Sequence, residues 1–142
     1  MKKKIDDDWK TKYVRALADY QNLEKRTWNE KEETRRFAIQ VFLERLLPVV
    51  DTFERATKHI NDQGLTLALK ELEAVLTEFG VTKIKTAGRE FNPHEMECIE
   101  VAMGEENKVV EELQSGYKLH EKILRVAKVK VGLPAQAGKK EA

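Results

Sequence analysis

Apolar residues recur at helical spacing through the first third of the chain. Neither glycine nor proline interrupts residues 5–47. Five apolar side chains follow the alternating four- and three-residue spacing of a coiled-coil seam: Trp9, Tyr13, Ala16, Tyr20 and Leu23. The pattern predicts one helix over about 42 residues, roughly 60 Å long.

The same register then passes through residues that suit a seam poorly. Thr27, Glu30 and Thr34 occupy the next positions, before Phe37 and Val41 restore the apolar seam. A short chain has no other segment that could cover so long a helix, so we expect it to pair with a second copy of itself. The polar middle predicts a loose or locally unwound seam.

A second helical region follows Pro48. Proline lacks a backbone donor and clashes with the carbonyl four residues earlier, so we expect a break at Leu47–Pro48, with Pro48 in the first turn of a new helix. Residues 61–64 form a turn, and residues 65–79 carry a wide apolar helical face that Gly80 ends. One such helical hairpin cannot bury both of its faces, whereas two hairpins from two chains make a four-helix bundle.

Beyond Gly80 the period shortens to that of strands. Strands are expected at 98–103, 108–113, 117–119 and 123–131, and turn residues separate them. The fold class is therefore α+β: a long coiled-coil helix, a helical hairpin that forms a dimeric bundle, and a small β domain. The expected domains are a stalk at 1–47, a dimerisation hairpin at 48–80, a β domain at 81–132 and a disordered tail at 133–142.

Composition and charge narrow the function classes. The 142 residues include 26 basic and 25 acidic side chains, a net charge of +1. This balance argues against a nucleic-acid or membrane-surface partner, which a basic excess would favour. The single cysteine fits a reducing compartment. The N-terminus resembles neither a secretory signal nor an Arg-rich leader, so a bacterial cytoplasm is favoured over a mitochondrial matrix.

Candidate catalytic and metal-binding residues are few. His94 and Cys98 have helical spacing, but a zincin helix needs a second histidine where Cys98 stands. A thiol nucleophile at Cys98 with a histidine base would also need an orienting group and an oxyanion loop. The simpler interpretation is a loop histidine and a small buried cysteine. We therefore expect no catalytic residues, no metal and no cofactor, and not an enzyme.

Five segments together resemble the GrpE family, the nucleotide exchange factors of DnaK-type chaperones. In order they are RALADYQNLEKR (15–26), LLPVVDTFERA (46–56), GLTLALKELEAVLTEFGV (64–81), FNPHEMECI (91–99) and LQSGYKLHEKILRVAKVKV (113–131). The resemblance covers residues 9–131. It implies a parallel homodimer in which one β domain enters the nucleotide-binding domain of a chaperone, opens its cleft and promotes ADP release. It also implies roles in protein folding and the stress response, admits an unfolded polypeptide as a further partner, and suggests temperature sensing by the stalk.

The resemblance also implies which residues meet each partner. The chaperone-facing candidates are Leu113, Lys122, Arg125, Val131, Asn92 and Pro93. Leu113 and Val131 could instead pack the sheet, and Arg125 could be a structural ion pair. The expected dimer interface contains Tyr13, Tyr20, Leu23, Phe37, Val41, Leu47, Val50, Phe53, Leu69, Leu72 and Leu76. The alternative to an exchange factor is a structural coiled-coil dimer with a capping β domain.

Overall fold

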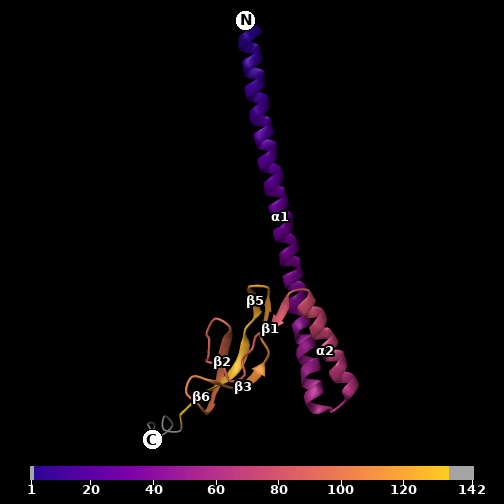
Figure 1. The fold of residues 1–142 in the computed structure, drawn as a ribbon, viewed down its shortest axis with the longest axis vertical. Helices are drawn as coiled ribbons and strands as arrows, with labels where there is room; N and C mark the ends of the chain where they lie inside the picture. Colours follow the sequence, from indigo (N-terminus) through magenta and orange to yellow (C-terminus); the bar gives the residue numbers. More distant parts are fainter. Residues whose placement is uncertain (1, 135–142) are drawn as a thin grey trace. The chain divides into compact units, whose positions relative to one another are not determined.

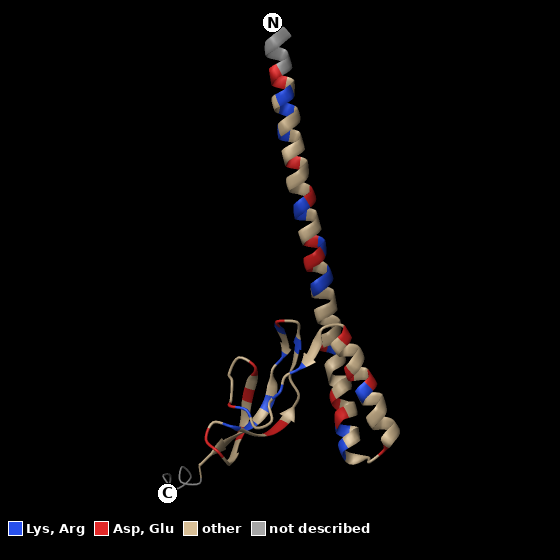
Figure 2. Cartoon of the chain, in the orientation of Figure 1, with Lys and Arg blue, Asp and Glu red and all other residues tan. Residues whose placement is uncertain are grey.

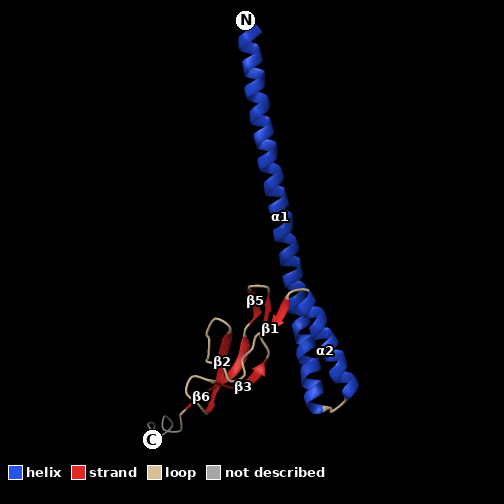
Figure 3. Ribbon diagram, viewed as in Figure 1, coloured by secondary structure: helices blue, strands red, loops and turns tan. Residues whose placement is uncertain are grey.

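The computed structural model describes residues 2–134, with side chains described for residues 7–134. Within them the chain forms two helices and six strands (Figures 1 and 3). In chain order the elements are α1 (Lys2–His59), α2 (Gln63–Glu78), β1 (Val81–Lys83), β2 (Met96–Met103), β3 (Val109–Gln114), β4 (Tyr117–Leu119), β5 (Lys122–Arg125) and β6 (Ala127–Leu133). The expected α+β fold is confirmed.

The chain divides into two compact units, residues 1–41 and 42–142. The described part of the first unit is helix throughout, and Figure 2 shows acidic and basic residues interspersed along it. Its large apolar side chains are exposed, with Trp9 and Tyr13 both 69% accessible. Asp8 and Lys12, four residues apart on the helix, form an ion pair at 2.7 Å. This unit therefore has helical structure without a core of its own.

The expected break at Leu47–Pro48 is wrong. Helix α1 continues through Pro48 to His59. Proline offers no N–H to the preceding turn, but Leu47 and Val50 on either side are 2% and 0% exposed. Burial of these two side chains requires the helical geometry on both sides of the proline, and tertiary packing therefore overrides the local penalty.

Both ends of α2 carry the residues that a helix boundary favours. Asp62 is the N-cap, and its Oδ1 accepts a hydrogen bond from the Leu65 amide at 2.8 Å. Gly80 ends the segment with a φ of +85°, and a Cβ added there would lie 2.2 Å from the His120 ring. Glycine therefore allows the chain to turn sharply out of α2 while the β4–β5 hairpin packs against the turn.

The first buried cluster joins the C-terminal part of α1, α2 and the first strands. Its members are Leu43, Leu47, Val50, Leu76, Val81 and Tyr117. Leu119 and Leu124, both from the hairpin of β4 and β5, pack against it. We call residues 42–59 of α1 together with α2 the helix pair, and residues 81–133 the β module. The cluster shows that the helix pair and the β module share one apolar core.

The β module contains two three-stranded sheets, in the orders β1-β4-β5 and β2-β6-β3. The first sheet is antiparallel, whereas β2 runs parallel to β6 in the second. A second buried cluster lies on the second sheet and contains Met96, Val109, Ala127, Val129 and Val131. Each sheet therefore contributes to a separate core.

The expected single strand at 123–131 is wrong in one respect. The chain divides at Val126 into β5 and β6, which belong to different sheets. At the division Gly116 lies against Ala127, and a Cβ on Gly116 would be 2.5 Å from the Ala127 nitrogen. Val126 and Ala127 are consecutive apolar residues between the polar Arg125 and Lys128, so the alternation changes phase at the bend. The prediction of one strand overlooked this shift.

The remaining strands agree closely with expectation. Residues 117–119 match β4, while the strands expected at 98–103 and 108–113 correspond to β2 and β3. The predicted tail at 133–142 begins inside β6, and its residues 135–142 lie outside the described part of the chain. In the described residues, neither helix combines the length and apolar character needed to cross a membrane.

Candidate functional site

The six expected chaperone-facing residues come from four parts of the β module: the loop before β2, and strands β3, β5 and β6. Asn92 and Pro93 lie in the loop before β2, and Leu113 lies near the end of β3 with 42% of its surface exposed. Lys122 is the first residue of β5 and is exposed. Leu113, Lys122 and Pro93 therefore present surface to solvent, whereas Asn92 and Arg125 are half-buried and Val131 is buried.

Val131 lies in the core of the second sheet. It is 8% exposed, and its neighbours in the cluster include Val129 at 0% and Met96 at 3%. In the sheet register it faces Val101 of β2 and Val109 of β3. This placement corresponds to the sheet-packing alternative raised from the sequence.

Arg125 forms a bidentate ion pair with Asp51 of α1. Its Nη1 and Nη2 donate to Oδ2 and Oδ1 of Asp51, each at 2.7 Å. Its Nε and Nη2 also donate to the Ser115 carbonyl at 3.1 and 2.6 Å. The two paired side chains are only 20% and 19% exposed. Arg125 therefore has the structural ion pair that the sequence left as an alternative.

One helical turn from Asp51, Glu54 receives three donors from the β module. Tyr117 Oη and Lys83 Nζ donate to Oε1 at 3.0 and 2.9 Å. Ser115 Oγ lies 2.9 Å from Oε2. The i,i+4 spacing of Glu54 and Lys58 favours a local ion pair, but the structure gives Glu54 these longer-range contacts. Glu54, a helix carboxylate that would ordinarily lie on a solvated surface, thus accepts hydrogen bonds from several residues of the β module.

The environment shifts the pKa values of both Glu54 and Tyr117. Burial raises the pKa of the Glu54 carboxyl, but hydrogen bonds from Lys83, Ser115 and Tyr117 outweigh it, so the net pKa lies below its ordinary value. Burial, together with the adjacent Glu54 charge, raises the pKa of the Tyr117 hydroxyl. At neutral pH, Glu54 is therefore an anion and Tyr117 a neutral donor.

Asn92 shapes the loop that leads into β2. Its Oδ1 accepts the His94 amide at 3.0 Å, and its carbonyl accepts the amides of Glu95 and Met96 at 3.1 and 2.9 Å. Glu95 in turn forms an ion pair with Lys118 of β4. The loop is thus held by side-chain and backbone bonds, and Pro93 is exposed at its surface.

His94 and Cys98 do not form a cluster with further ligands. His94 lies in the exposed loop, and Cys98 lies on β2 with its Sγ 3.3 Å from the Glu100 carbonyl. Cys98 is exposed, so the expectation of a buried cysteine is wrong. In the described residues, no group of three or more histidine, cysteine, aspartate or glutamate side chains is arranged to hold a metal ion.

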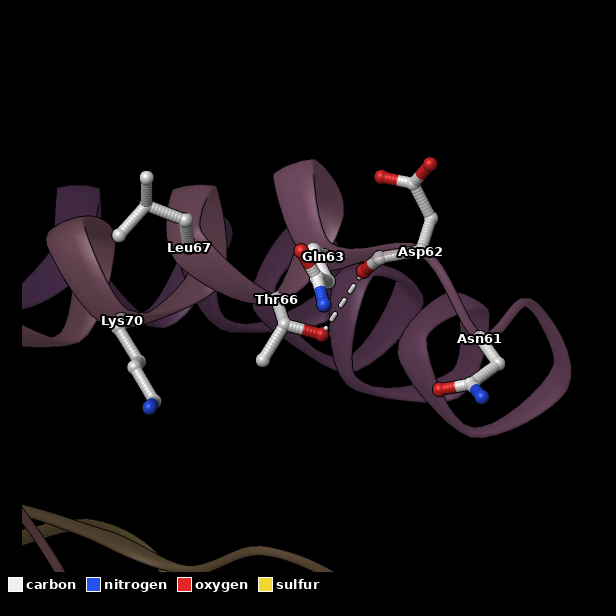
Figure 4. Close-up of a pocket in the computed structure, with 6 residues that line it drawn as sticks. All are labelled: Asn61, Asp62, Gln63, Thr66, Leu67 and Lys70. Atoms are coloured by element: carbon white, nitrogen blue, oxygen red, sulfur yellow. Dashed lines mark hydrogen bonds between the residues drawn. The ribbon is translucent and has the colours of Figure 1, made fainter.

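A hollow of about 350 Å³ lies at the turn between the helices. Figure 4 shows its lining residues, which are Asn61, Asp62, Gln63, Thr66, Leu67 and Lys70. Asp62 already caps the first turn of α2, and Thr66 Oγ1 donates to the Asp62 carbonyl at 3.0 Å. Two of the polar residues that line the hollow, Asp62 and Thr66, therefore stabilise the start of α2.

The chain also matches a protein-family model over most of its length. The model described as GrpE matches residues 1–132. The chain belongs to the GrpE family. The match includes both described helices and nearly all of the β module, so family membership covers the helix pair and the candidate surface together.

Individual relatives support the same membership. Protein GrpE of Carboxydothermus hydrogenoformans is 42% identical over 128 residues, which cover 84% of this chain and 66% of the relative. Protein GrpE of Oceanobacillus iheyensis is 38% identical over 136 residues, covering 88% and 71%. Protein GrpE of Gloeobacter violaceus is 37% identical over 139 residues, covering 89% and 71%. The chain thus spans about two thirds of the length of these curated relatives.

The expected dimer-interface residues of this GrpE family member fall into two groups. Leu47, Val50 and Leu76 are buried within the chain itself, and Leu69 and Leu72 pack against the same cluster. The remaining six are exposed, by 36% to 69%: Tyr13, Tyr20, Leu23, Phe37, Val41 and Phe53. The exposed group leaves apolar surface in contact with solvent in the single chain.

The sequence did not predict that Asp51, Glu54 and Tyr117 connect α1 to the β module. A carboxylate near lysines and arginines on a helix looks like part of a solvated surface, and a tyrosine in a short strand looks like a core residue. Glu54 and Tyr117 are 63 positions apart, and Asp51 and Arg125 are 74 apart. Local periodicity contains no signal for pairs at such separations.

Proposed function

We propose that this GrpE family member is a co-chaperone that binds the nucleotide-binding domain of a DnaK-type chaperone and promotes ADP release. The family match over residues 1–132 carries the proposal, because it includes the β module as well as the helices. In this role the protein makes and breaks no covalent bonds. It binds the open form of the chaperone more tightly than the closed form, and the affinity for ADP falls by the same factor.

The contact surface proposed for the chaperone centres on Lys122. Lys122, Leu113 and Pro93 are exposed on the β module and supply a charge and apolar surface. Asn92 fixes the loop that carries Pro93. Arg125 and Val131 support this surface from within, because their side chains are largely occupied by Asp51 and by the sheet core.

A homodimer is the second part of the proposal. The helix at residues 7–41 exposes Trp9, Tyr13, Tyr20 and Phe37 by 61% to 69%. A parallel copy of the same helix would cover these side chains through coiled-coil packing. The bacterial sources of the relatives favour a bacterial cytoplasm as the place of action.

Stopped-flow release of a fluorescent ADP analogue from a DnaK-type chaperone tests the function. We expect the wild-type chain to accelerate release in a saturable manner, and Lys122→Glu to slow it while the dimer stays intact. Lys128→Glu is the matched control, because Lys128 is another exposed lysine of the β module. Dimerisation without any acceleration by the wild-type chain would favour the structural scaffold instead.

An equal loss of acceleration in both lysine variants would reject the specific role of Lys122. Sedimentation equilibrium of the two variants checks that each retains the oligomeric state of the wild-type chain. The comparison thus separates a local contact from a general effect of charge on the β module.

A further inference from the structure

Three side chains in one cross-strand row connect the β module to α1. Lys83 of β1 faces Tyr117 of β4, and Tyr117 faces Arg125 of β5 in the sheet register. Directly paired residues project from the same face of a sheet. Each strand of the β1-β4-β5 sheet therefore contributes one hydrogen-bond donor toward the same helix.

The acceptors are two carboxylates one turn apart on α1. Arg125 donates to both oxygens of Asp51 at 2.7 Å, while Tyr117 and Lys83 donate to Glu54 at 3.0 and 2.9 Å. The Arg125 guanidinium also lies over the Tyr117 ring, 5.8 Å from its centroid. We call Asp51, Glu54, Lys83, Tyr117 and Arg125 the polar joint.

Further bonds brace the polar joint from β3 and the segments that flank the sheet. Gln114 donates to Asp51 Oδ2 at 3.0 Å. Ser115 Oγ lies 2.9 Å from Glu54 and 3.0 Å from Glu112, and its single hydrogen serves one of them at a time. Glu112 also accepts a hydrogen bond from Thr86. The joint is therefore a connected network in which charged groups have several partners each.

The polar joint supplies a directional constraint that the shared apolar core lacks. Apolar burial is nondirectional, so it holds the β module near the helix pair but permits tilting. A bidentate guanidinium–carboxylate pair fixes both distance and angle. Combined with the Tyr117–Glu54 bond, it leaves the module one favoured orientation.

We propose that the polar joint locks the β module onto the helix pair in one orientation and thereby makes Tyr117 and Arg125 positioning residues for nucleotide exchange. This inference rests on the proposed exchange function. A ligand shifts a conformational equilibrium only by its differential affinity for the two states. A rigid module fits one chaperone conformation, whereas a tilting module adapts to both and loses that difference. Loosening the joint therefore lowers the exchange rate more than the affinity.

Two conservative substitutions test the proposal. Tyr117→Phe removes only the hydroxyl. Arg125→Lys keeps the positive charge but removes the planar guanidinium group that bonds both oxygens of Asp51. Lys130→Gln is the control, because Lys130 pairs with Glu100 of β2 and Glu111 of β3 in the other sheet, at 3.3 and 3.1 Å. Circular dichroism confirms that each variant is folded before the other measurements.

The orientation of the β module on the helix pair is followed through the distance between two spin labels, measured by pulsed electron–electron double resonance. Spin labels are placed at the exposed positions Lys58→Cys and Glu106→Cys in a Cys98→Ser background, with excess unlabelled protein so that the measured labels lie in one chain. We expect a narrow distance distribution for the wild type and Lys130→Gln, and a broad one for Tyr117→Phe and Arg125→Lys. Unchanged widths in both joint variants would overturn the proposal.

Exchange kinetics provide the second measurement. We expect the maximal rate of ADP release to fall about tenfold in both joint variants, while affinity for the chaperone stays within about threefold. A parallel loss of rate and affinity would make these residues contacts, and would overturn the positioning role. If the wild type does not accelerate release at all, the exchange function fails, and the distance distributions alone then decide whether the joint fixes orientation.

Discussion

Helix α1 runs through two regions with different sources of order. In residues 7–41 its large apolar side chains face solvent, whereas in residues 42–59 Leu47 and Val50 are 2% and 0% exposed. Both regions are helical, because α1 is continuous from Lys2 to His59. Secondary structure is therefore the same on either side of Val41, and tertiary burial is not.

The contrast indicates which packing stabilises the helix in each region. An isolated helix in water is marginal, and most helical stability in proteins comes from packing of an apolar face. Residues 42–134 contain two buried clusters that supply this packing within one chain. Residues 7–41 expose the corresponding side chains, and in the proposed homodimer a second copy covers them. The predictions below separate the self-contained region from the dependent one.

Removal of a core leucine produces the largest expected difference. Leu47→Ala should lower the free energy of unfolding by about 3 kcal/mol, because it removes buried methyl groups and leaves a cavity. Leu17→Ala, at a position 43% exposed and off the coiled-coil seam, should cost less than about 0.5 kcal/mol. Urea unfolding followed by circular dichroism measures both, and similar losses would remove the contrast between the regions.

Two ion pairs of equal length allow a matched comparison of burial. Asp51–Arg125 and Asp8–Lys12 both have a closest distance of 2.7 Å, but the side chains of the first pair are 19–20% exposed and those of the second 62–66%. We expect a coupling free energy of about 2 kcal/mol for the first pair. The exposed i,i+4 pair should give about 0.3 kcal/mol.

Double-mutant cycles with Asp51→Asn and Arg125→Gln, and with Asp8→Asn and Lys12→Gln, measure the two couplings. Equal couplings would show that burial does not distinguish the regions electrostatically. A coupling near zero for Asp51–Arg125 would also remove the energetic basis of the polar joint.

Acid should weaken the self-contained region through Glu54. Its folded pKa lies below the ordinary value of 4.5, so its stabilising contribution is complete above that value and is lost as the pH falls through the folded pKa. Glu54→Gln should cost about 1 kcal/mol at about pH 7 and less at about pH 3. Urea unfolding at the two pH values tests this, and a pH-independent cost would contradict the assigned bonding of Glu54.

The smallest expected effect concerns the weak part of the stalk seam. Thr34 Oγ1 bonds back to the Glu30 carbonyl at 2.8 Å, a contact that adds nothing to pairing between helices. Both tryptophans, Trp9 and Trp28, lie in residues 7–41, so their fluorescence reports this region alone. We expect the fluorescence transition to precede the main circular dichroism transition on heating.

Thr34→Leu should raise the temperature of the fluorescence transition by about 3 °C and leave the main transition unchanged. A single coincident transition in the wild type would count against separate melting of the stalk. It would also count against the thermosensor role that the family resemblance suggests.

Much of the fold was accessible from periodicity, while the joint between its parts was not. Spacing predicted the long helix, the end of α2 at Gly80 and the strand at 117–119, because each depends on neighbouring residues. The break at Pro48 was predicted wrongly, since burial of Leu47 and Val50 comes from residues far along the chain. The division at Val126 was missed although the alternation changes phase there, because a single pair of adjacent apolar residues is a weak signal against a long apolar-rich run.

The candidate surface was predictable only through family resemblance. In the residue pattern Lys122 is one charged residue among many. The family resemblance alone made it a candidate for contact with the chaperone. The roles of Asp51 and Glu54 depend on partners between 29 and 74 positions away. Such pairings become visible when the chain is folded, and they changed Arg125 from a contact candidate to a residue of the polar joint.

The central claim, that the protein opens a chaperone by preferring its nucleotide-free form, is tested most directly by reciprocal binding. Isothermal titration calorimetry measures the affinity of the protein for two forms of a DnaK-type chaperone, one without nucleotide and one saturated with ADP. We expect binding to the nucleotide-free chaperone to be at least about tenfold tighter, and saturating protein to weaken ADP binding by the same factor. Equal affinities for the two chaperone forms would contradict the account.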